Sequence, residues 1–493
     1  MATPLSSPGA AGARRGWYWP AGLAVLLLLD LAFTFWRNYQ LPLDGDLAPT
    51  VLPAPWYAQV LHDPFGWSAL TRHELYSGPN RFFAHAAMSA YWKLGPRLLQ
   101  RVLSPITSLY VASALFTTLT QAGLLFLLAR LVQLATGAGR AQLWVIAALL
   151  VPFFQTARGF YEQMGITDRA VTYTFFYAFA MVLLLVLVLP FYRAALWQQP
   201  LHLPASQALL LVGLMVVVSF NGPVATATVA VLLVLVAGYW GWQQLRRRRG
   251  RAGASPGWLT GQTLGLLAIL GVLSLYSFYI GRYNIENSHT HTVWQLYQLL
   301  PGGLAHYLLF QPGLPVLLLA ALLNVLLVRR LAPSAGRQRL LRTLGWVGVF
   351  GMLYLLLLPL GGYRSYRPYL LRNDTALPVV LGAVFAYGYS TYFLLGQLGG
   401  RGRGAYVLGV LALSAFFLRA DGLPDGSPTS DCERWSLDQL ARAGEPVVEV
   451  AGFCPVLTWG LATDPQQSEI AGQMLYYWHV TPTVKTYYQK PPL

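Results

Sequence analysis

Long apolar runs recur along the whole chain, and most of them approach the length of a helix that crosses a membrane. Such a helix needs about 20 apolar residues, and shorter ones are tolerated inside a bundle. Only 11% of the 493 residues are charged and the mean hydropathy is +0.47, whereas soluble domains carry roughly 25% charged residues. We therefore predict an integral membrane protein and exclude a soluble enzyme, a secreted module and a disordered chain.

Eleven segments qualify as membrane spans, which predicts an all-α polytopic bundle. The turn Asn221–Pro223 could instead lie within a re-entrant hairpin, because a Gly-Pro turn at membrane depth must be buried in protein. The predicted spans are 20–36, 106–128, 142–157, 170–190, 206–219, 224–242, 259–280, 304–328, 344–360, 376–396 and 405–418.

The charged residues predict the orientation of these spans. With the N-terminus in the cytoplasm, the inside loops hold many arginines, including the cluster 246–251, and no acidic residue. Of the 18 acidic residues only Asp30 lies in a predicted span, and all the others fall outside the cytoplasm. This segregation explains the net charge of +16 without a nucleic-acid partner. The Arg-, Ala- and Leu-rich composition favours a bacterial inner membrane.

The predicted topology leaves two long elements on the outer face. One is the loop 37–105 of a membrane domain 1–418, in which 56–70 and 80–103 are typical of helices lying in the membrane interface. The other is an extracytoplasmic C-terminal domain, 419–493.

The C-terminal domain contains β-like runs at 446–451 and 483–488, which predict a small α/β cap. Its residues Cys432 and Cys454 are the two cysteines of the chain. An outside location would permit a disulfide between them, and two free buried thiols are the alternative.

The first candidate site is the acidic pair Asp44 and Asp46, directly after the first span. Two carboxylates on a turn at the membrane surface could act as a general base or bind a divalent cation. Because Asp-Gly is also a common turn signal, a purely structural role is an equal alternative on spacing alone.

The next outside loop carries a second acidic group, Glu162 and Asp168. By itself it could be a solvated helix connection. Predicted topology nevertheless places these acids on the same face as Asp44 and Asp46, where a substrate site could collect them.

A late outer loop alternates Tyr363, Arg364, Tyr366 and Arg367, and Arg372 follows. Guanidinium groups bind phosphate oxygens in pairs, and tyrosine rings can line a sugar or interface pocket. The alternative is an interfacial belt whose arginines reach lipid phosphates. Because the positive-inside bias disfavours arginines on the outer face, we favour the binding of an anionic headgroup.

Another outside loop contains His289 and His291 near Glu286. His-x-His with a nearby carboxylate could ligate a metal or supply an acid or base. Further ligands at typical spacing are missing, so a polar loop with two solvated histidines is the favoured interpretation and a metal site stays open.

Together, the acidic pair after an N-inside first span, the interfacial helices, the second acidic loop and the late arginines resemble the GT-C superfamily. Those proteins are multi-span glycosyltransferases that take sugars from polyprenol-phosphate carriers. The segment 372–378 is similar to the Arg-Tyr-x-x-Pro run of such enzymes, with Asn373 in place of the aromatic residue. The resemblance implies a catalytic Asp44 or Asp46, a second acidic loop at Glu162 and Asp168, and a carrier-phosphate grip by Arg364, Arg367 or Arg372.

We therefore expect a glycosyltransferase that moves a sugar from a polyprenol-phosphate donor to a lipid or glycan acceptor on the extracytoplasmic face, among membrane lipids. A lipid-phosphate leaving group already carries its charge, so a general acid is dispensable and no cofactor is certain, although Mg²⁺ or Mn²⁺ could bind. The alternatives are a transporter or flippase of lipid-linked glycans, which inverted repeats would favour, and a non-catalytic membrane assembly subunit.

Overall fold

The computed structural model describes residues 18–154, 164–248, 257–287, 290–310, 312–364, 369–422 and 429–490. Within these ranges, nine helical segments are long and apolar enough to cross a membrane, which indicates a multi-pass membrane protein. They are α1 (Tyr18–Tyr39), α6 (Pro105–Thr136), the continuous run α9 (Val171–Tyr173), η3 (Thr174–Ala178) and α10 (Phe179–Trp197), then α12 (Pro223–Arg248), α13 (Gly261–Gly281), α15 (Gly313–Arg330), α16 (Ala335–Leu357) with η4 (Leu358–Gly361), α17 (Asn373–Gln397) and α18 (Gly400–Gly422).

The remaining two predicted spans correspond to shorter apolar helices. These are α7 (Gln142–Leu150), continued by the 3-10 turn η2 (Val151–Phe153), and α11 (Ala205–Ser219). The turn between α11 and α12 is buried, with Phe220 and Asn221 at most 2% exposed, as a Gly-Pro turn inside a bundle requires.

One predicted span, 304–328, had the wrong bounds. The structure divides this region into α14 (Val293–Phe310) and α15, which begins at Gly313 directly after Pro312. Pro315 then lies in the first turn of α15, where the missing N–H leaves no intrahelical hydrogen bond unmade. The apolar pattern continues across this break, so hydropathy alone could not locate it.

Three helices form the centre of the bundle. In α6, the α9–α10 run and α17, between 50% and 61% of the apolar window is buried, compared with 11% in α1, α16 and α18. The first three are therefore packed on most sides by other helices, whereas the outer three present apolar side chains outward, as lipid-facing helices do.

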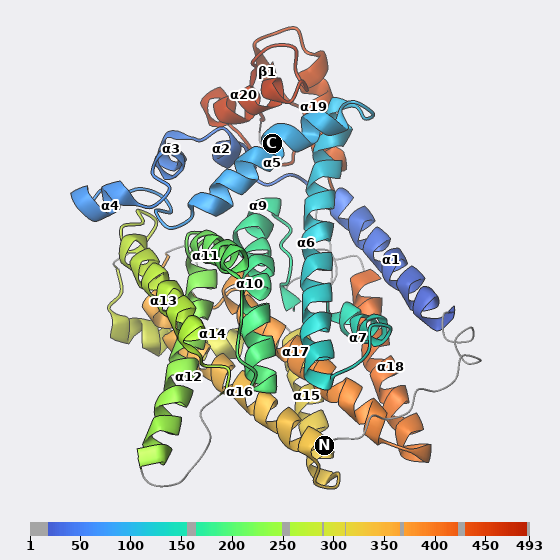
Figure 1. The fold of residues 1–493 in the computed structure, drawn as a ribbon. Coiled ribbons are helices and arrows are strands. Elements are labelled where there is room, and N and C mark those ends of the chain that lie inside the picture. Colours follow the sequence, from blue (N-terminus) through green and yellow to red (C-terminus); the bar gives the residue numbers. More distant parts are fainter. Residues whose placement is uncertain are drawn as a thin grey trace.

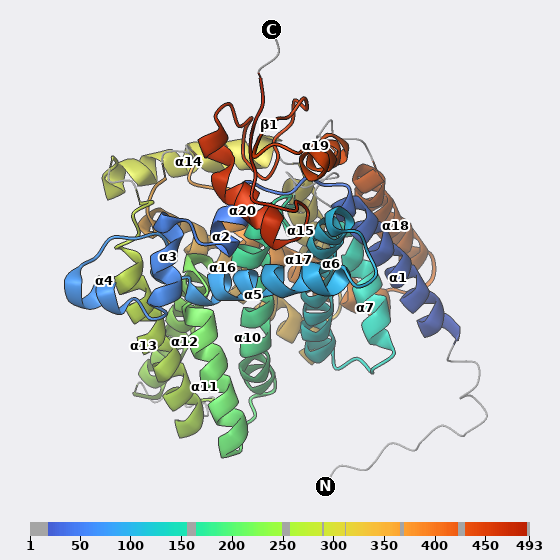
Figure 2. The ribbon, with the colours of Figure 1, turned by 90° about the horizontal axis from the view of Figure 1, so that it is seen from above.

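Short helices lie across one end of the bundle, which we call the cap face. They follow α1 along the chain and include an amphipathic helix, α5, that crosses the ends of the central helices (Figures 1 and 2). Helices are thus confirmed in both regions of the first loop that were predicted to form them. Their bounds are α2 (Leu47–Val51), α3 (Pro55–His62), α4 (Trp67–Arg72) and α5 (Phe82–Leu99).

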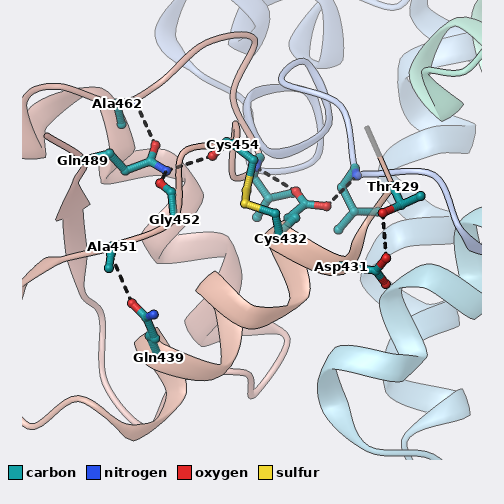
Figure 3. Close-up of a disulfide and its surroundings, with 12 residues drawn as sticks. Thr429, Asp431, Cys432, Gln439, Ala451, Gly452, Cys454, Ala462 and Gln489 are labelled. Atoms are coloured by element: carbon teal, nitrogen blue, oxygen red, sulfur yellow. Dashed lines mark hydrogen bonds between the residues drawn. A yellow bond between two sulfur atoms is a disulfide. The ribbon is translucent and has the colours of Figure 1, made fainter. Parts of the chain in front are cut away.

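The C-terminal segment 429–490 covers the same end of the bundle (Figure 1). Both predicted β-like runs form strands, and the strands pair in parallel with Val448 opposite Tyr487. Cys432 and Cys454 form a disulfide, so the alternative of two free thiols was wrong (Figure 3). The elements are α19 (Asp431–Arg442), β1 (Val447–Glu449), η5 (Pro465–Ser468), α20 (Glu469–Tyr477) and β2 (Thr486–Tyr488).

Side chains of the C-terminal segment anchor it to the bundle. The Arg434 guanidinium lies 3.6 Å from the ring centroid of Tyr110 in α6 and donates to the carbonyl of Tyr39 at the end of α1. The Trp478 indole donates to the carbonyl of Trp92 in α5, at 2.9 Å. These contacts hold the segment against the end of α1, α5 and the start of α6.

Candidate functional site at the cap face

Asp44 lies in the link between α1 and α2 and is buried. Its carboxylate accepts hydrogen bonds from the Thr172 hydroxyl, at 2.7 Å, and from the backbone N–H groups of Thr172 and Asp46, each at 3.1 Å. Burial raises the pKa of the Asp44 carboxyl to about 7, although the Thr172 hydrogen bonds lower it. Asp44 therefore joins the first loop to the start of α9.

Asp46 is more exposed and faces the C-terminal segment. Its carboxylate accepts a hydrogen bond from the Trp459 indole at 3.0 Å, and the Trp459 ring stacks on Tyr173 with centroids 5.9 Å apart. Burial raises the pKa of Asp46, whereas hydrogen bonds from Trp459 and Tyr173 lower it. Asp46 thus lies between the first loop, the α9–α10 run and the C-terminal segment.

Gly45 allows this close approach. A Cβ at position 45 would lie 2.6 Å from the carbonyl carbon of Thr458, well inside van der Waals contact. The Asp-Gly-Asp order therefore does more than form a turn, because the glycine lets residues 458–459 reach the second aspartate.

Arg372 caps α17 and approaches the same tyrosine. Its guanidinium lies 4.7 Å from the Tyr173 ring centroid and forms an ion pair with buried Asp374. The positive charge of Arg372 also lowers the pKa of Asp46. The structure thus brings together a carboxylate and a guanidinium that were predicted from segments more than 300 residues apart.

A second ion pair joins Arg364 to Glu286, with 2.6 Å between the charged groups. The Ser77 hydroxyl donates to the same carboxylate at 2.5 Å. Burial alone would raise the pKa of Glu286, but the charges of Arg81 and Arg364 outweigh it and hold the pKa below its usual value. The Glu286 charge in turn raises the pKa of Asp46, so it belongs to the same electrostatic group.

Asp168 lies close to this group, on the side of α17. Its carboxylate accepts from the Ala170 N–H at 2.9 Å, and it shares the lining of a small cavity with Tyr173 and Asp374. Gly165, at φ +55°, packs against Asn373 so tightly that a side chain would not fit. The second acidic loop therefore contacts the start of α17, on the face that also holds Asp44 and Asp46, as topology predicted.

The other predicted site residues divide into two groups. Tyr363 is buried, with its ring centroid 4.3 Å from that of His291 and its side chain in a cluster with Leu296 and Leu370. A role of this pair in substrate binding stays a prediction. Glu162, His289, Tyr366 and Arg367 lie outside the described residues.

Two buried polar side chains near the start of α5 have hydrogen-bonding atoms that are not satisfied within the described residues. Among the described residues, neither the Asn221 amide nor His85 Nδ1 has a hydrogen-bond partner. The His85 ring packs on Phe176, and Asn221 follows Phe220, whose carbonyl accepts from the Phe83 N–H at the start of α5. Such groups can accept a water molecule or a substrate hydroxyl.

The described part of the chain contains no group of three or more His, Cys, Asp or Glu side chains arranged to hold a metal ion. A divalent cation at Asp44 and Asp46 therefore stays a prediction, and it would need further ligands from substrate phosphate or water.

A scan against protein-family models found no match to this chain, and a search of curated proteins found no significantly similar sequence. Functional inference must therefore start from the chemistry of the site. Sequence reasoning had missed Trp459 and Tyr173 altogether and had treated Glu286 only as a neighbour of the histidines. No local pattern identifies Trp459, which is 413 residues from Asp46 along the chain.

Proposed function

We propose that this protein is an integral-membrane glycosyltransferase, which transfers a sugar from a polyprenol-phosphate donor to a lipid or glycan acceptor at the cap face. One observation carries the proposal: the carboxylate of Asp46 and the guanidinium of Arg372 lie around the same ring, Tyr173. Glycosyl transfer needs this combination of a proton acceptor and a cation for the departing phosphate.

Asp46 is the general base in this mechanism. Its carboxylate is partly exposed, and burial raises its pKa, which makes it a stronger base than an exposed aspartate. Asp44 is a positioning residue, because it is buried and its oxygens already accept hydrogen bonds from Thr172 and from the Asp46 backbone.

Arg372 is the better of the two described candidates for the donor phosphate. Its side chain is 31% exposed, whereas that of Arg364 is 12% exposed and held by Glu286. A phosphate that reaches Arg372 would share the guanidinium with Asp374, and the planar group has enough donors for both.

In the proposed transfer step, Asp46 takes up the proton and the phosphate takes up the electron pair. The acceptor hydroxyl loses its proton to Asp46, and its oxygen forms a bond with the anomeric carbon of the sugar. The bond from that carbon to the phosphate oxygen breaks, and the electron pair leaves on the phosphate. Arg372 stabilises the released polyprenol phosphate, whose charge removes the need for a general acid.

The same proposal places the cap face outside the cytoplasm and counts eleven spans, with α7 and α11 included. The sidedness has a direct test with single cysteine substitutions and an impermeant thiol reagent in intact cells. Glu445→Cys in the C-terminal segment should be labelled, and Arg401→Cys at the start of α18 should be protected. The reverse pattern would contradict the orientation.

A reconstituted system tests the reaction class. Proteoliposomes would receive a labelled polyprenol-phosphate sugar together with a mixture of lipid and glycan acceptors. We expect label in a new product, with loss of that product in Asp46→Asn. Movement of the intact donor between leaflets without transfer would instead support a transporter.

A further inference from the structure

A large cavity extends from the end of the bundle opposite the cap face into its interior. Its volume is about 690 Å³, within the range of roughly 300–1,000 Å³ for ligand pockets. It lies between α6, α10, α12, α16 and α17, and its wall is mainly aliphatic and aromatic. Representative lining residues are Leu131, Leu184, Leu235, Trp346, Phe350 and Phe385.

The charged lining of this cavity is confined to one end. Gln338, Arg339 and Arg342 line it from the first turns of α16, at the end of the bundle opposite the cap face (Figure 1). The Arg339 guanidinium lies 4.4 Å from the ring of Trp197, near the last turn of α10. Among the described residues that line the cavity, none is acidic.

The length of the cavity fits one leaflet of a bilayer. Arg339 and Phe350 both line it from α16, and their separation of 11 positions corresponds to about 16 Å at 1.5 Å per residue. Half of the hydrocarbon core of a bilayer is about 15 Å thick. A chain that enters beside Arg339 would therefore end near the middle of the membrane.

We propose that this cavity binds an anionic glycerophospholipid from the leaflet opposite the cap face. One acyl chain fills the apolar part, and the phosphate binds Arg339 and Arg342. Two guanidinium groups without a lining carboxylate select a negatively charged headgroup, and each can bind phosphate oxygens in pairs. Trp197 lies where the headgroup meets the hydrocarbon, a depth that tryptophan favours.

The position of the cavity's charged end distinguishes this lipid from the sugar donor of the proposed reaction. A donor phosphate at Arg372 would lie at the cap face, whereas the arginines of the cavity lie at the other end. On α17 the lining begins at Pro378 and continues away from Arg372. The phospholipid site therefore stands independently of the glycosyltransferase proposal.

Native mass spectrometry of the purified full chain tests this site. The protein in detergent would be titrated with phosphatidylglycerol and, separately, with phosphatidylcholine of the same chain length. We expect a one-lipid complex that is at least tenfold tighter for phosphatidylglycerol. In Arg339→Gln/Arg342→Gln this preference should fall by tenfold or more, as the loss of charged hydrogen bonds predicts.

Matched controls separate this site from general attraction to a basic surface. Arg401→Gln/Arg403→Gln removes the same charge from the same end of the bundle but leaves the cavity lining intact, so it should retain the preference. Ala195→Phe places a ring in the cavity and should weaken both lipids if one chain occupies it. Size-exclusion profiles and thermal melting would verify that each variant is folded.

Several results would overturn the proposal. Equal affinity for the two lipids, equal losses in both arginine pairs, or unchanged binding in Ala195→Phe would each contradict it. A co-purified polyprenyl phosphate in place of a phospholipid would also contradict it, because the occupant would then be the carrier.

Discussion

Glu433 and Asp44 are two buried carboxyl groups on the same face of the bundle, and burial raises the pKa of each to about 7. Glu433 accepts from Leu43 N–H at 2.8 Å, Leu457 N–H at 3.1 Å and the Tyr110 hydroxyl at 2.8 Å. Its donors therefore come from the first loop, α6 and the C-terminal segment, and they hold these three parts together.

The surroundings of Asp44 differ in one respect that matters for chemistry. Asp44 is followed two residues later by Asp46, a partly exposed carboxylate. The charge of Glu286 raises the pKa of Asp46, and the charge of Arg372 lowers it. A raised pKa is thus shared by Glu433, by Asp44 and by Asp46, the proposed base. The charge of Arg372 and partial exposure distinguish Asp46 from the two buried carboxyl groups, and substitutions can test that distinction.

The largest effect on stability is expected at Glu433. Glu433→Ala leaves three buried donors without an acceptor, which should lower the free energy of unfolding by about 3–5 kcal/mol. Thermal melting in detergent measures the loss, and Glu445→Ala, an exposed position of the same segment, should change stability by less than about 0.5 kcal/mol. A small loss at Glu433 would contradict its architectural role.

The next effect concerns donor binding. Arg372→Ala should weaken use of the polyprenol-phosphate donor by about 1.5–3 kcal/mol, the scale of a charged hydrogen bond. The substitution also removes the ion pair with buried Asp374 and should lower the melting temperature, so donor use is measured on folded protein well below the melting transition. Lysine should restore binding only in part, because it lacks the paired donors. The exposed Arg442→Ala serves as the control, and donor dependence equal to wild type in Arg372→Ala would remove the phosphate role.

A smaller effect is expected at Trp459. Trp459→Phe keeps an aromatic ring on Tyr173 but removes the N–H that stabilises the Asp46 carboxylate, a loss of about 1 kcal/mol. Because that hydrogen bond lowers the pKa of Asp46, its removal should raise the pKa and move the acid limb of the rate profile to higher pH. Trp435→Phe, exposed on the same segment, should leave the profile unchanged, and an unchanged profile in both would exclude Asp46 as the titrating group.

Much of the architecture could be predicted because hydropathy and charge act locally. Apolar runs located most of the helices, and the arginines 329–342 and 401–403 lie at the end of the bundle opposite the cap face, where no acidic residue occurs in these segments. The cap face holds acids and arginines together, as the ion pairs of Arg364 and Arg372 show. The helix break at Pro312 was not predicted, because the apolar residues on both sides of it form one continuous run in the sequence.

The site could be predicted only in part. Topology placed Asp44, Asp46, Asp168 and Arg372 on one face, and the structure brings them close together. The contact of Trp459 with Asp46 depends on how the C-terminal segment docks through Glu433 and Arg434, which is a matter of long-range packing. Neither spacing nor composition encodes that docking.

The most direct test of the proposed chemistry compares sugar transfer by Asp46→Asn and Asp44→Asn, with exposed Asp438→Asn as the control. Asparagine keeps the size of the side chain but cannot accept the proton, so Asp46→Asn should lower turnover about 10²–10⁴-fold while donor binding persists. Asp44→Asn should lose less, since its carboxylate only positions its neighbour. Full transfer activity in the Asp44→Asn/Asp46→Asn double variant would contradict the proposed mechanism.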